Sequence, residues 1–189
     1  MISIEEEKFS VIYEMDGYTP QDFIDSLALD KNRKKVFQAG EGAGASGSFF
    51  FFSDDNRFII KTLRGHEKKV LLDLLDDYIN HIQCTSNKSL LTRIYGVFTI
   101  KTNFFAPMDV IIMQNTIQMN NPQNSKVTFD LKGSTVSRYT KTKERSFIHQ
   151  KRVLKDLNLL EMNKALNNQL IRIPNKIQEE LLAMLDKDS

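Results

Sequence analysis

The stretch GAGASGSFFFF, residues 42–52, restricts the fold of this chain more than any other feature. Its glycines at 42, 44 and 47 form a G-x-G-x-x-G pattern, which several unrelated folds use to wrap phosphates. In a dinucleotide-binding fold such a loop opens a helix, because the pyrophosphate lies at the helix N-terminus. Here Ser48 and four phenylalanines follow, which predict a strand. A Walker-type loop is excluded as well, because Ser48 stands where that motif requires lysine.

A third use of the pattern is a glycine-rich hairpin over nucleotide phosphates, followed by a strand that presents a lysine. The segments SFFFFS and NRFIIKTL predict two strands joined at the turn 53–56, and Lys61 lies in the second strand. A lysine among apolar strand residues needs a partner, which Glu67 offers from the apolar side of the next helix. The alternative is a surface lysine and a glutamate that favours the helix dipole.

The pattern along the whole chain predicts an α+β fold, with helices packed on an antiparallel sheet. Further strands are predicted at 93–101, 109–116 and 127–132. The FFFF run is predicted to be buried on both faces of its strand. Helices are predicted at 19–29, at 66–83 and in IPNKIQEELLAML near the C-terminus. The apolar face of the second helix is predicted to comprise Val70, Leu71, Leu74, Leu75, Tyr78 and Ile82.

Charge and composition narrow the classes of ligand. The formal net charge is +2, but residues 126–155 carry nine Lys or Arg against two acidic residues. Such a segment attracts phosphates on a nucleotide, a lipid or a nucleic acid, or is simply a solvated loop. No specific nucleic-acid site is predicted, because the aromatic residues at 49–52 are not interleaved with basic ones.

Histidine and cysteine usage gives no case for a metal site. The three histidines are scattered, and the single cysteine, Cys84, permits no internal disulfide. A lone cysteine is typical of a reducing, intracellular setting. The acidic N-terminus does not have the pattern of a secretory signal, and no apolar run is long enough to span a membrane.

A series of motifs resembles the phosphatidylinositol phosphate kinase family from about residue 9 to the end. The matching segments are GASGSFFF (44–51), FIIKT (58–62), HEKKVLLDLLDDYINHI (66–82), LLTRIYGVFTIK (90–101), VIIMQNTI (110–117), FDLKGSTVSR (129–138) and LKDLNLL (154–160). The resemblance implies that 1–189 is part of such a kinase domain. Residues 9–118 would form a nucleotide-binding lobe like the N-lobe of a protein kinase. Residues 119–189 would start the second part, with a basic loop and a terminal helix.

The resemblance implies an ATP-dependent kinase of a phosphoinositide head group, most directly a phosphatidylinositol 4-phosphate 5-kinase. Lys61 would hold the nucleotide with Glu67 as its brace. The other implied nucleotide-binding residues are the loop over the phosphates and two residues near the adenine: Gly44, Ala45, Ser46, Gly47, Ser48, Met113 and Asn115. The implied catalytic residues, facing the phosphates and the inositol, are Asp130, Lys132 and Arg138. Asp130 and Lys132 lie two apart on an extended segment and so point the same way, although a simple ion pair is the alternative.

The chain also departs from the family pattern. The family carries an M-D-Y-S-L-L motif with the catalytic aspartate, a later metal-binding aspartate and a loop that selects the phosphoinositide, and none is found in these 189 residues. The C-terminal lobe is therefore expected to be missing, Mg²⁺ to lack ligands here, and the chain alone to be inactive. The alternative hypothesis is a non-catalytic nucleotide- or phosphoinositide-binding module derived from the family.

The resemblance also implies partners. A phosphoinositide at an anionic membrane surface would be the main one, which places the protein in the cytoplasm, peripheral to the inner face of the plasma membrane. A lobe without its second half would expose apolar surface, which a homodimer could cover.

Overall fold

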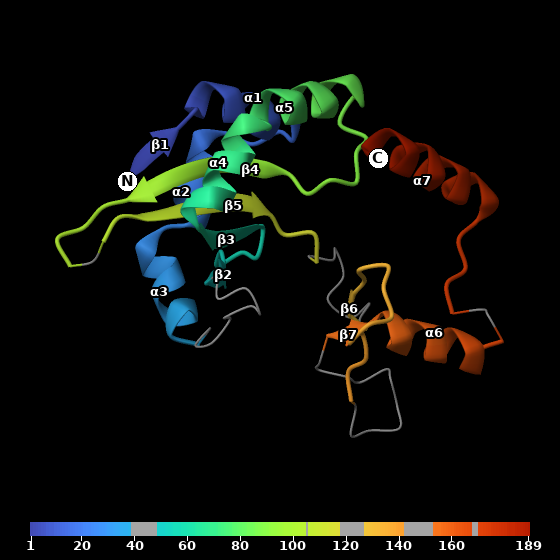
Figure 1. The fold of residues 1–189 in the computed structure, drawn as a ribbon. Coiled ribbons are helices and arrows are strands. Elements are labelled where there is room, and N and C mark those ends of the chain that lie inside the picture. The colour runs from blue at the N-terminus through green and yellow to red at the C-terminus, as the bar shows by residue number, and fades with distance from the viewer. Residues whose placement is uncertain (39–48, 105, 118–126, 142–152, 168–169) are drawn as a thin grey trace. The chain divides into compact units, whose positions relative to one another are not determined.

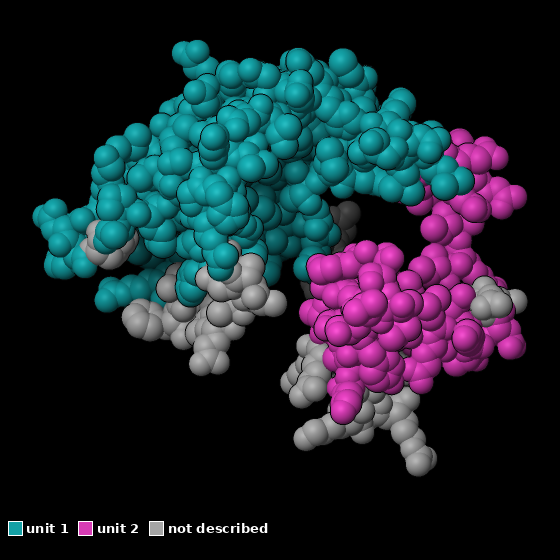
Figure 2. Space-filling model, in the orientation of Figure 1, with its two compact units in different colours: residues 1–118, 182–189 teal, residues 119–181 magenta. Residues whose placement is uncertain are grey.

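A computed structural model describes residues 1–38, 49–104, 106–117, 127–141, 153–167 and 170–189, with side chains 34–38 excepted. By its contacts the chain divides into two compact units, which Figure 2 shows in different colours. Unit 1 comprises residues 1–118 and 182–189, and unit 2 comprises residues 119–181.

Unit 1 is built on a five-stranded sheet in the order β1-β4-β5-β3-β2, in which every neighbouring pair is antiparallel (Figure 1). The strands are β1 (Ile2–Ile4), β2 (Phe50–Phe52), β3 (Phe58–Leu63), β4 (Ile94–Ile100) and β5 (Met108–Gln114). Four of the five strands agree with the predicted segments. The sequence pattern missed β1, because three residues are too few to show an alternation.

The prediction that the FFFF run is buried on both faces is wrong. Strand β2 is at the edge of the sheet and pairs with β3 alone. Phe49 and Phe52 are each 42% exposed. An edge strand has a neighbour on one side only, so its side chains gain less cover than those of a central strand.

The helices of unit 1 are α1 (Glu6–Met15), α2 (Pro20–Ser26), α3 (Leu29–Gln38), α4 (Gly65–Asp73) and α5 (Leu75–Cys84). Helix α2 confirms the predicted start of the helix at 19–29, but it ends at Ser26, and a separate helix, α3, begins at Leu29. At its start, Asp22 accepts hydrogen bonds from the backbone and the hydroxyl of Thr19, at 2.8 and 2.7 Å. This capping arrangement satisfies the first helical turn.

The helix predicted over 66–83 divides into α4 and α5 at Leu74, whose φ of −95° and ψ of −1° depart from helical values. The single apolar face predicted for it is therefore wrong in part. Val70 and Leu74 are 55% and 54% exposed, whereas the buried residues belong to α5: Leu75, Ile79 and Ile82. The change of direction at Leu74 separates side chains that one continuous helix would align.

The core of unit 1 lies between the sheet and its helices. Phe58 of β3, Val97 of β4 and Ile12 of α1 are fully buried within it. Phe23 of α2 packs on Phe58, with ring centroids 4.7 Å apart. Helix α1 was not predicted, although its buried residues Phe9, Ile12 and Tyr13 follow helical spacing.

Unit 2 is a smaller assembly in which strand β6 (Phe129–Asp130) pairs in parallel with β7 (Leu154–Lys155). The strand predicted over 127–132 is thus confirmed but shorter. Helix α6 (Asp156–Ala165) follows β7 directly. The predicted terminal helix is confirmed as α7 (Asn175–Asp188), whose residues up to 181 belong to unit 2 and whose remaining residues belong to unit 1. Among the residues that the structure describes, no helix is both long and apolar enough to cross a membrane.

Candidate functional site

The predicted pair of Lys61 and Glu67 is present in the structure. Lys61 Nζ on β3 lies 3.1 Å from Glu67 Oε1 on α4, and the side chains are 20% and 28% exposed. The second oxygen of Glu67 accepts a hydrogen bond of 2.8 Å from the backbone N–H of Arg64. Helix α4 lies across the sheet in Figure 1, and Lys68 of the same helix pairs with Asp109 of β5 at 2.8 Å. Two ion pairs thus join α4 to the sheet.

The charge of Glu67 is stabilised by its neighbours. The hydrogen bond from the Arg64 backbone, followed by that from the Lys61 ammonium, holds the pKa of Glu67 below its usual range. Glu67 is therefore ionised at neutral pH. It can hold the lysine in one orientation while leaving part of the ammonium accessible.

The register of the sheet places other predicted residues around Lys61. In the β3–β5 pairing Ile59 lies opposite Met113, and Lys61 lies opposite Ile111. Residues two apart on a strand share a face, so Met113 and Lys61 are on the same face of the sheet. On the other side, Lys61 lies opposite Phe50, with its Nζ 6.0 Å from the ring centroid.

Asn115 follows the end of β5 and is buried, with 9% of its surface exposed. Its side-chain Nδ2 donates to the carbonyl of Asn56 at 2.7 Å, and its Oδ1 accepts from the backbone N–H of Ile117 at 3.1 Å. Its own N–H donates to the carbonyl of Arg57 at 3.0 Å. The side chain thus ties the turn between β2 and β3 to the end of β5.

The predicted glycine loop, Gly44 to Ser48, lies outside the described residues. The chain is described again from Phe49, whose N–H donates to the Thr62 hydroxyl at 2.9 Å and whose carbonyl accepts from the Thr62 N–H at 3.0 Å. Because Thr62 is adjacent to Lys61, these two bonds place Phe49 beside the lysine.

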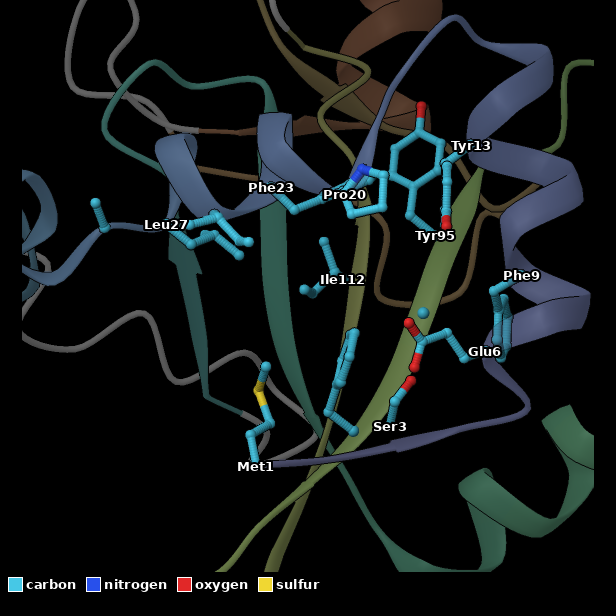
Figure 3. Close-up of a pocket in the computed structure, with 14 residues that line it drawn as sticks. Met1, Ser3, Glu6, Phe9, Tyr13, Pro20, Phe23, Leu27, Tyr95 and Ile112 are labelled. Carbon is cyan, nitrogen blue, oxygen red and sulfur yellow. The ribbon is translucent and has the colours of Figure 1, made fainter.

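A cavity of about 480 Å³ opens on the other face of the sheet (Figure 3). Ile112 of β5 lines it and lies opposite Ile60, whose side chain points away from that of Lys61. Its other walls include Phe9 of α1 and Phe23 of α2. The described residues that line it include no lysine or arginine and none of the predicted site residues. An apolar cavity of this kind is poorly matched to phosphates.

In unit 2, the structure brings together the three residues predicted as catalytic. Lys132 Nζ lies 2.9 Å from Asp130 Oδ1, and these side chains are 62% and 42% exposed. Arg138 is only 10% exposed and donates both to the carboxylate of Asp130, at 3.4 Å, and to its backbone carbonyl. Lys132 is therefore the most exposed of the three side chains.

The sequence prediction missed Asp156, the first residue of α6. Its Oδ1 accepts from the backbone N–H groups of Lys132 and Gly133, at 3.0 and 2.9 Å, and its Oδ2 accepts from Arg138 Nε at 2.7 Å. The Arg138 guanidinium, followed by the Lys132 N–H, holds the pKa of Asp156 well below its usual range although the carboxylate is partly buried. The segment LKDLNLL was recognisable, but an acidic residue at a helix start suggests only an interaction with the helix dipole.

The described residues offer no metal centre, since no three histidine, cysteine, aspartate or glutamate side chains among them could hold an ion together. No residue is therefore assigned to Mg²⁺.

Comparison with known proteins agrees with the motifs. The profile of the family described as phosphatidylinositol-4-phosphate 5-kinase matches residues 31–189. The chain is 34% identical over 167 residues to phosphatidylinositol 4-phosphate 5-kinase 8 of Arabidopsis thaliana. The matched region covers 87% of this chain and 20% of that protein. It is 36% identical over 171 residues to phosphatidylinositol 4-phosphate 5-kinase 5 of the same plant, covering 89% of this chain and 20% of that protein.

A fungal relative shows the same resemblance. The chain is 38% identical over 105 residues to phosphatidylinositol 4-phosphate 5-kinase its3 of Schizosaccharomyces pombe. The matched region covers 56% of this chain and 14% of that protein. The chain thus spans about a fifth of the length of the two plant relatives. With a family profile that matches most of its length, this chain belongs to the phosphatidylinositol-4-phosphate 5-kinase family.

Proposed function

We propose that this chain is part of a lipid kinase that transfers phosphate from ATP to the head group of phosphatidylinositol 4-phosphate. The observation that carries the proposal is the ion pair between Lys61 of β3 and Glu67 of α4, at 3.1 Å. A strand lysine held by a helix glutamate is the arrangement with which kinases bind nucleotide phosphates. Membership of the family and the names of the relatives support the choice of substrate.

Unit 1 would serve as the nucleotide-binding lobe, with an architecture like that of a protein-kinase N-lobe. When bound, ATP supplies the phosphoryl group. Lys61 would donate hydrogen bonds to its phosphates, and Glu67 would keep the ammonium on the correct side of the sheet. Met113, on the same face as Lys61, would contact the adenine, and Asn115 would shape the adjoining segment. The loop from Gly44 to Ser48 would close over the phosphates from its anchor at Phe49.

Unit 2 would contribute to the lipid side of the reaction through Asp130, Lys132 and Arg138. Lys132 is 62% exposed, so its ammonium can leave Asp130 and bind a phosphate oxygen at little cost. In the transition state the same charge would stabilise the oxygens of the phosphoryl group in transfer. Arg138, which is nearly buried, would hold Asp130 in place.

The proposal includes a membrane setting. A head group that carries phosphates lies at an anionic membrane surface, where basic residues such as Lys132, Lys141 and Lys155 would be attracted. The protein would then act in the cytoplasm, peripheral to the inner face of the plasma membrane. A homodimer would cover apolar side chains of unit 1 that are exposed, among them Val70 and Leu74.

Thermal unfolding with and without ATP tests the nucleotide site. A ligand that binds the folded chain at about 100 times its dissociation constant stabilises it by about 2.7 kcal/mol. We expect this protection in the 189-residue chain and its loss in Lys61→Ala. The matched control is Lys69→Ala on the exposed side of α4, which should keep the protection. Equal protection of the Lys61→Ala variant would remove Lys61 from the proposed role.

A further inference from the structure

Asp156 bonds to three residues of the segment 132–138, at its start and at its end. One carboxylate oxygen accepts from the backbone N–H groups of Lys132 and Gly133, and the other accepts from the Nε of Arg138. The carboxylate is 12% exposed, so it lies behind the loop and not at its surface. We propose that Asp156 is a positioning residue, which acts through Lys132 to hold its ammonium for a phosphate of the phosphoinositide head group. This inference rests on the proposed function.

The first oxygen of Asp156 fixes the backbone from which Lys132 extends. Gly133 has a φ of +64°, a left-handed conformation that turns the chain directly after Lys132. The turn points two successive N–H groups at one acceptor, and Asp156 Oδ1 occupies that position at 3.0 and 2.9 Å. Because these two N–H groups are already bonded to Asp156, Lys132 can offer an incoming phosphate its side-chain ammonium but not its backbone N–H.

The second oxygen of Asp156 fixes Arg138. All three guanidinium nitrogens have an acceptor: Nε bonds Asp156, and the two terminal nitrogens bond the carboxylate and the carbonyl of Asp130. Arg138 therefore links the two aspartates, and only 10% of its side chain is exposed. The guanidinium also places Asp130 where its carboxylate meets the Lys132 ammonium at 2.9 Å. Asp156 thus acts on Lys132 both through the backbone and through Arg138.

Helix α6 gives Asp156 a rigid base. Asn158, fully buried on the first turn, accepts from the N–H groups of Thr140 and Lys155, at 2.9 and 3.1 Å. Its Nδ2 donates to the Thr140 carbonyl at 3.1 Å. The loop from Gly133 to Thr140 is therefore tied to the same helical turn at both of its ends. Side chains that locate a binding group in proteins are commonly supported in this way.

Binding of the 189-residue chain to vesicles tests the inference. The vesicles are phosphatidylcholine with phosphatidylinositol 4-phosphate, or phosphatidylcholine with phosphatidylserine at equal surface charge. The variants are Asp156→Asn, Lys132→Ala and the double substitution. The matched control is Glu161→Gln, exposed on the same helix and bonded to Tyr139. Each variant's thermal unfolding is recorded, and Asp156→Glu, which keeps the charge but shifts the carboxylate, replaces Asp156→Asn if that variant does not fold.

The inference predicts a loss that depends on Lys132. Asp156→Asn, or Asp156→Glu in its place, should lower the affinity for phosphatidylinositol 4-phosphate vesicles about tenfold, the scale of one charge-assisted hydrogen bond. In the Lys132→Ala background the same substitution should cause no further loss, because the group it positions is gone. Glu161→Gln should bind as the original chain does.

Three results would overturn the inference. Unchanged affinity in the Asp156 variant would show that the loop does not need it. An equal loss with and without Lys132 would show an effect that does not pass through Lys132. Binding of the original chain that does not distinguish phosphatidylinositol 4-phosphate from phosphatidylserine would overturn the substrate class of the proposed function, and this inference with it. The first two results leave the proposed function intact.

Discussion

At the scale of single residues, the position of Lys61 is determined by a carboxylate with two partners. Glu67 accepts from the Arg64 backbone at 2.8 Å and from Lys61 at 3.1 Å, so the start of α4 and the strand lysine are fixed by the same group. A lysine ammonium on a flexible stem is otherwise a poorly located charge. In the proposed function the pair would orient Lys61 before a nucleotide binds, which would lower the entropy lost on binding.

Glu67→Gln separates the charge of this group from its shape. The amide oxygen can still accept from Arg64, but the attraction for the ammonium is lost, so we expect ATP to bind about threefold to tenfold more weakly. Isothermal titration of the 189-residue chain with ATP measures the change. Lys68→Ala, which breaks the pair between α4 and Asp109, is the control and should alter ATP affinity less. An affinity unchanged by Glu67→Gln would contradict the role of Glu67 as brace.

At the scale of elements, the hairpin of β2 and β3 is held by Asp55 in its turn. Asp55 accepts from the hydroxyls of Ser26 and Ser53, each at 2.7 Å, and from the side chain of Arg57 at 2.7 Å. Burial alone would raise the pKa of Asp55. The hydrogen bonds from Ser26, Ser53 and Arg57 outweigh burial and hold the pKa well below its usual range. The turn is thereby joined to the end of α2.

The lowered pKa of Asp55 predicts an acid-dependent stability. A carboxylate whose pKa is lower in the folded chain than in the unfolded chain stabilises the fold above its unfolded pKa, at about pH 4. This stabilisation is lost as the pH falls toward the pKa of the folded chain. Asp55→Asn should therefore lower the free energy of unfolding at pH 7 by about 1 kcal/mol, a value reduced for the partial exposure of Asp55. The free energy of unfolding of this variant should also fall less steeply as the pH is lowered. Urea titrations from pH 7 to about pH 3 measure both. Asp73→Asn, at an exposed position at the end of α4, is the control. If the free energy of unfolding of Asp55→Asn fell with pH in parallel to that of the original chain, the stabilising role of the Asp55 carboxylate would be contradicted.

The elements that the sequence could predict are those with a local signal. The hairpin carries turn residues between two apolar runs. Strands β4 and β5 have seven residues each, which is long enough for a strand pattern to be recognised. The break at Leu74 gave no such signal, because no proline or glycine lies near it. Its cause is tertiary, since Leu75 and Ile79 are buried in the core while Val70 is exposed.

The part of the candidate site that could be predicted from the sequence also depended on a local signal. Lys61 and Glu67 are six residues apart, so strand and helix patterns were enough to pair them. Asp156 is 24 residues from Lys132, and tertiary contacts such as the parallel pairing of β6 with β7 bring the two segments together. A pairing between two strands of two residues each leaves almost no trace in a sequence.

At the scale of the whole molecule, the family profile covers residues 31–189, whereas the relatives extend far beyond the matched region. The proposed site residues fall in two compact units, with Lys61 and Glu67 in unit 1 and Lys132 and Asp156 in unit 2. Phosphoryl transfer needs groups that bind the nucleotide and groups that bind the acceptor, together with a residue that orients the hydroxyl and ligands for metal ions.

We expect the 189 residues by themselves to bind ATP and to transfer no phosphate, because the family's M-D-Y-S-L-L motif is not among them. Labelled ATP, Mg²⁺ and phosphatidylinositol 4-phosphate vesicles measure the transfer, with Lys61→Ala as the background. Transfer above that background would show that these residues hold a complete catalytic set. ATP binding without transfer agrees with the proposal and also with a non-catalytic binding module.

A crystal structure of this chain with a non-hydrolysable ATP analogue would test the proposed nucleotide site directly. We expect Lys61 Nζ to lie within hydrogen-bond distance, about 3 Å, of a phosphate oxygen, with Glu67 still bonded to the same ammonium. We expect the adenine beside Met113, on the face of the sheet that carries Lys61. An analogue bound elsewhere, for example in the apolar cavity lined by Phe23 and Ile112, with Lys61 bonded to Glu67 alone, would contradict the proposed nucleotide site.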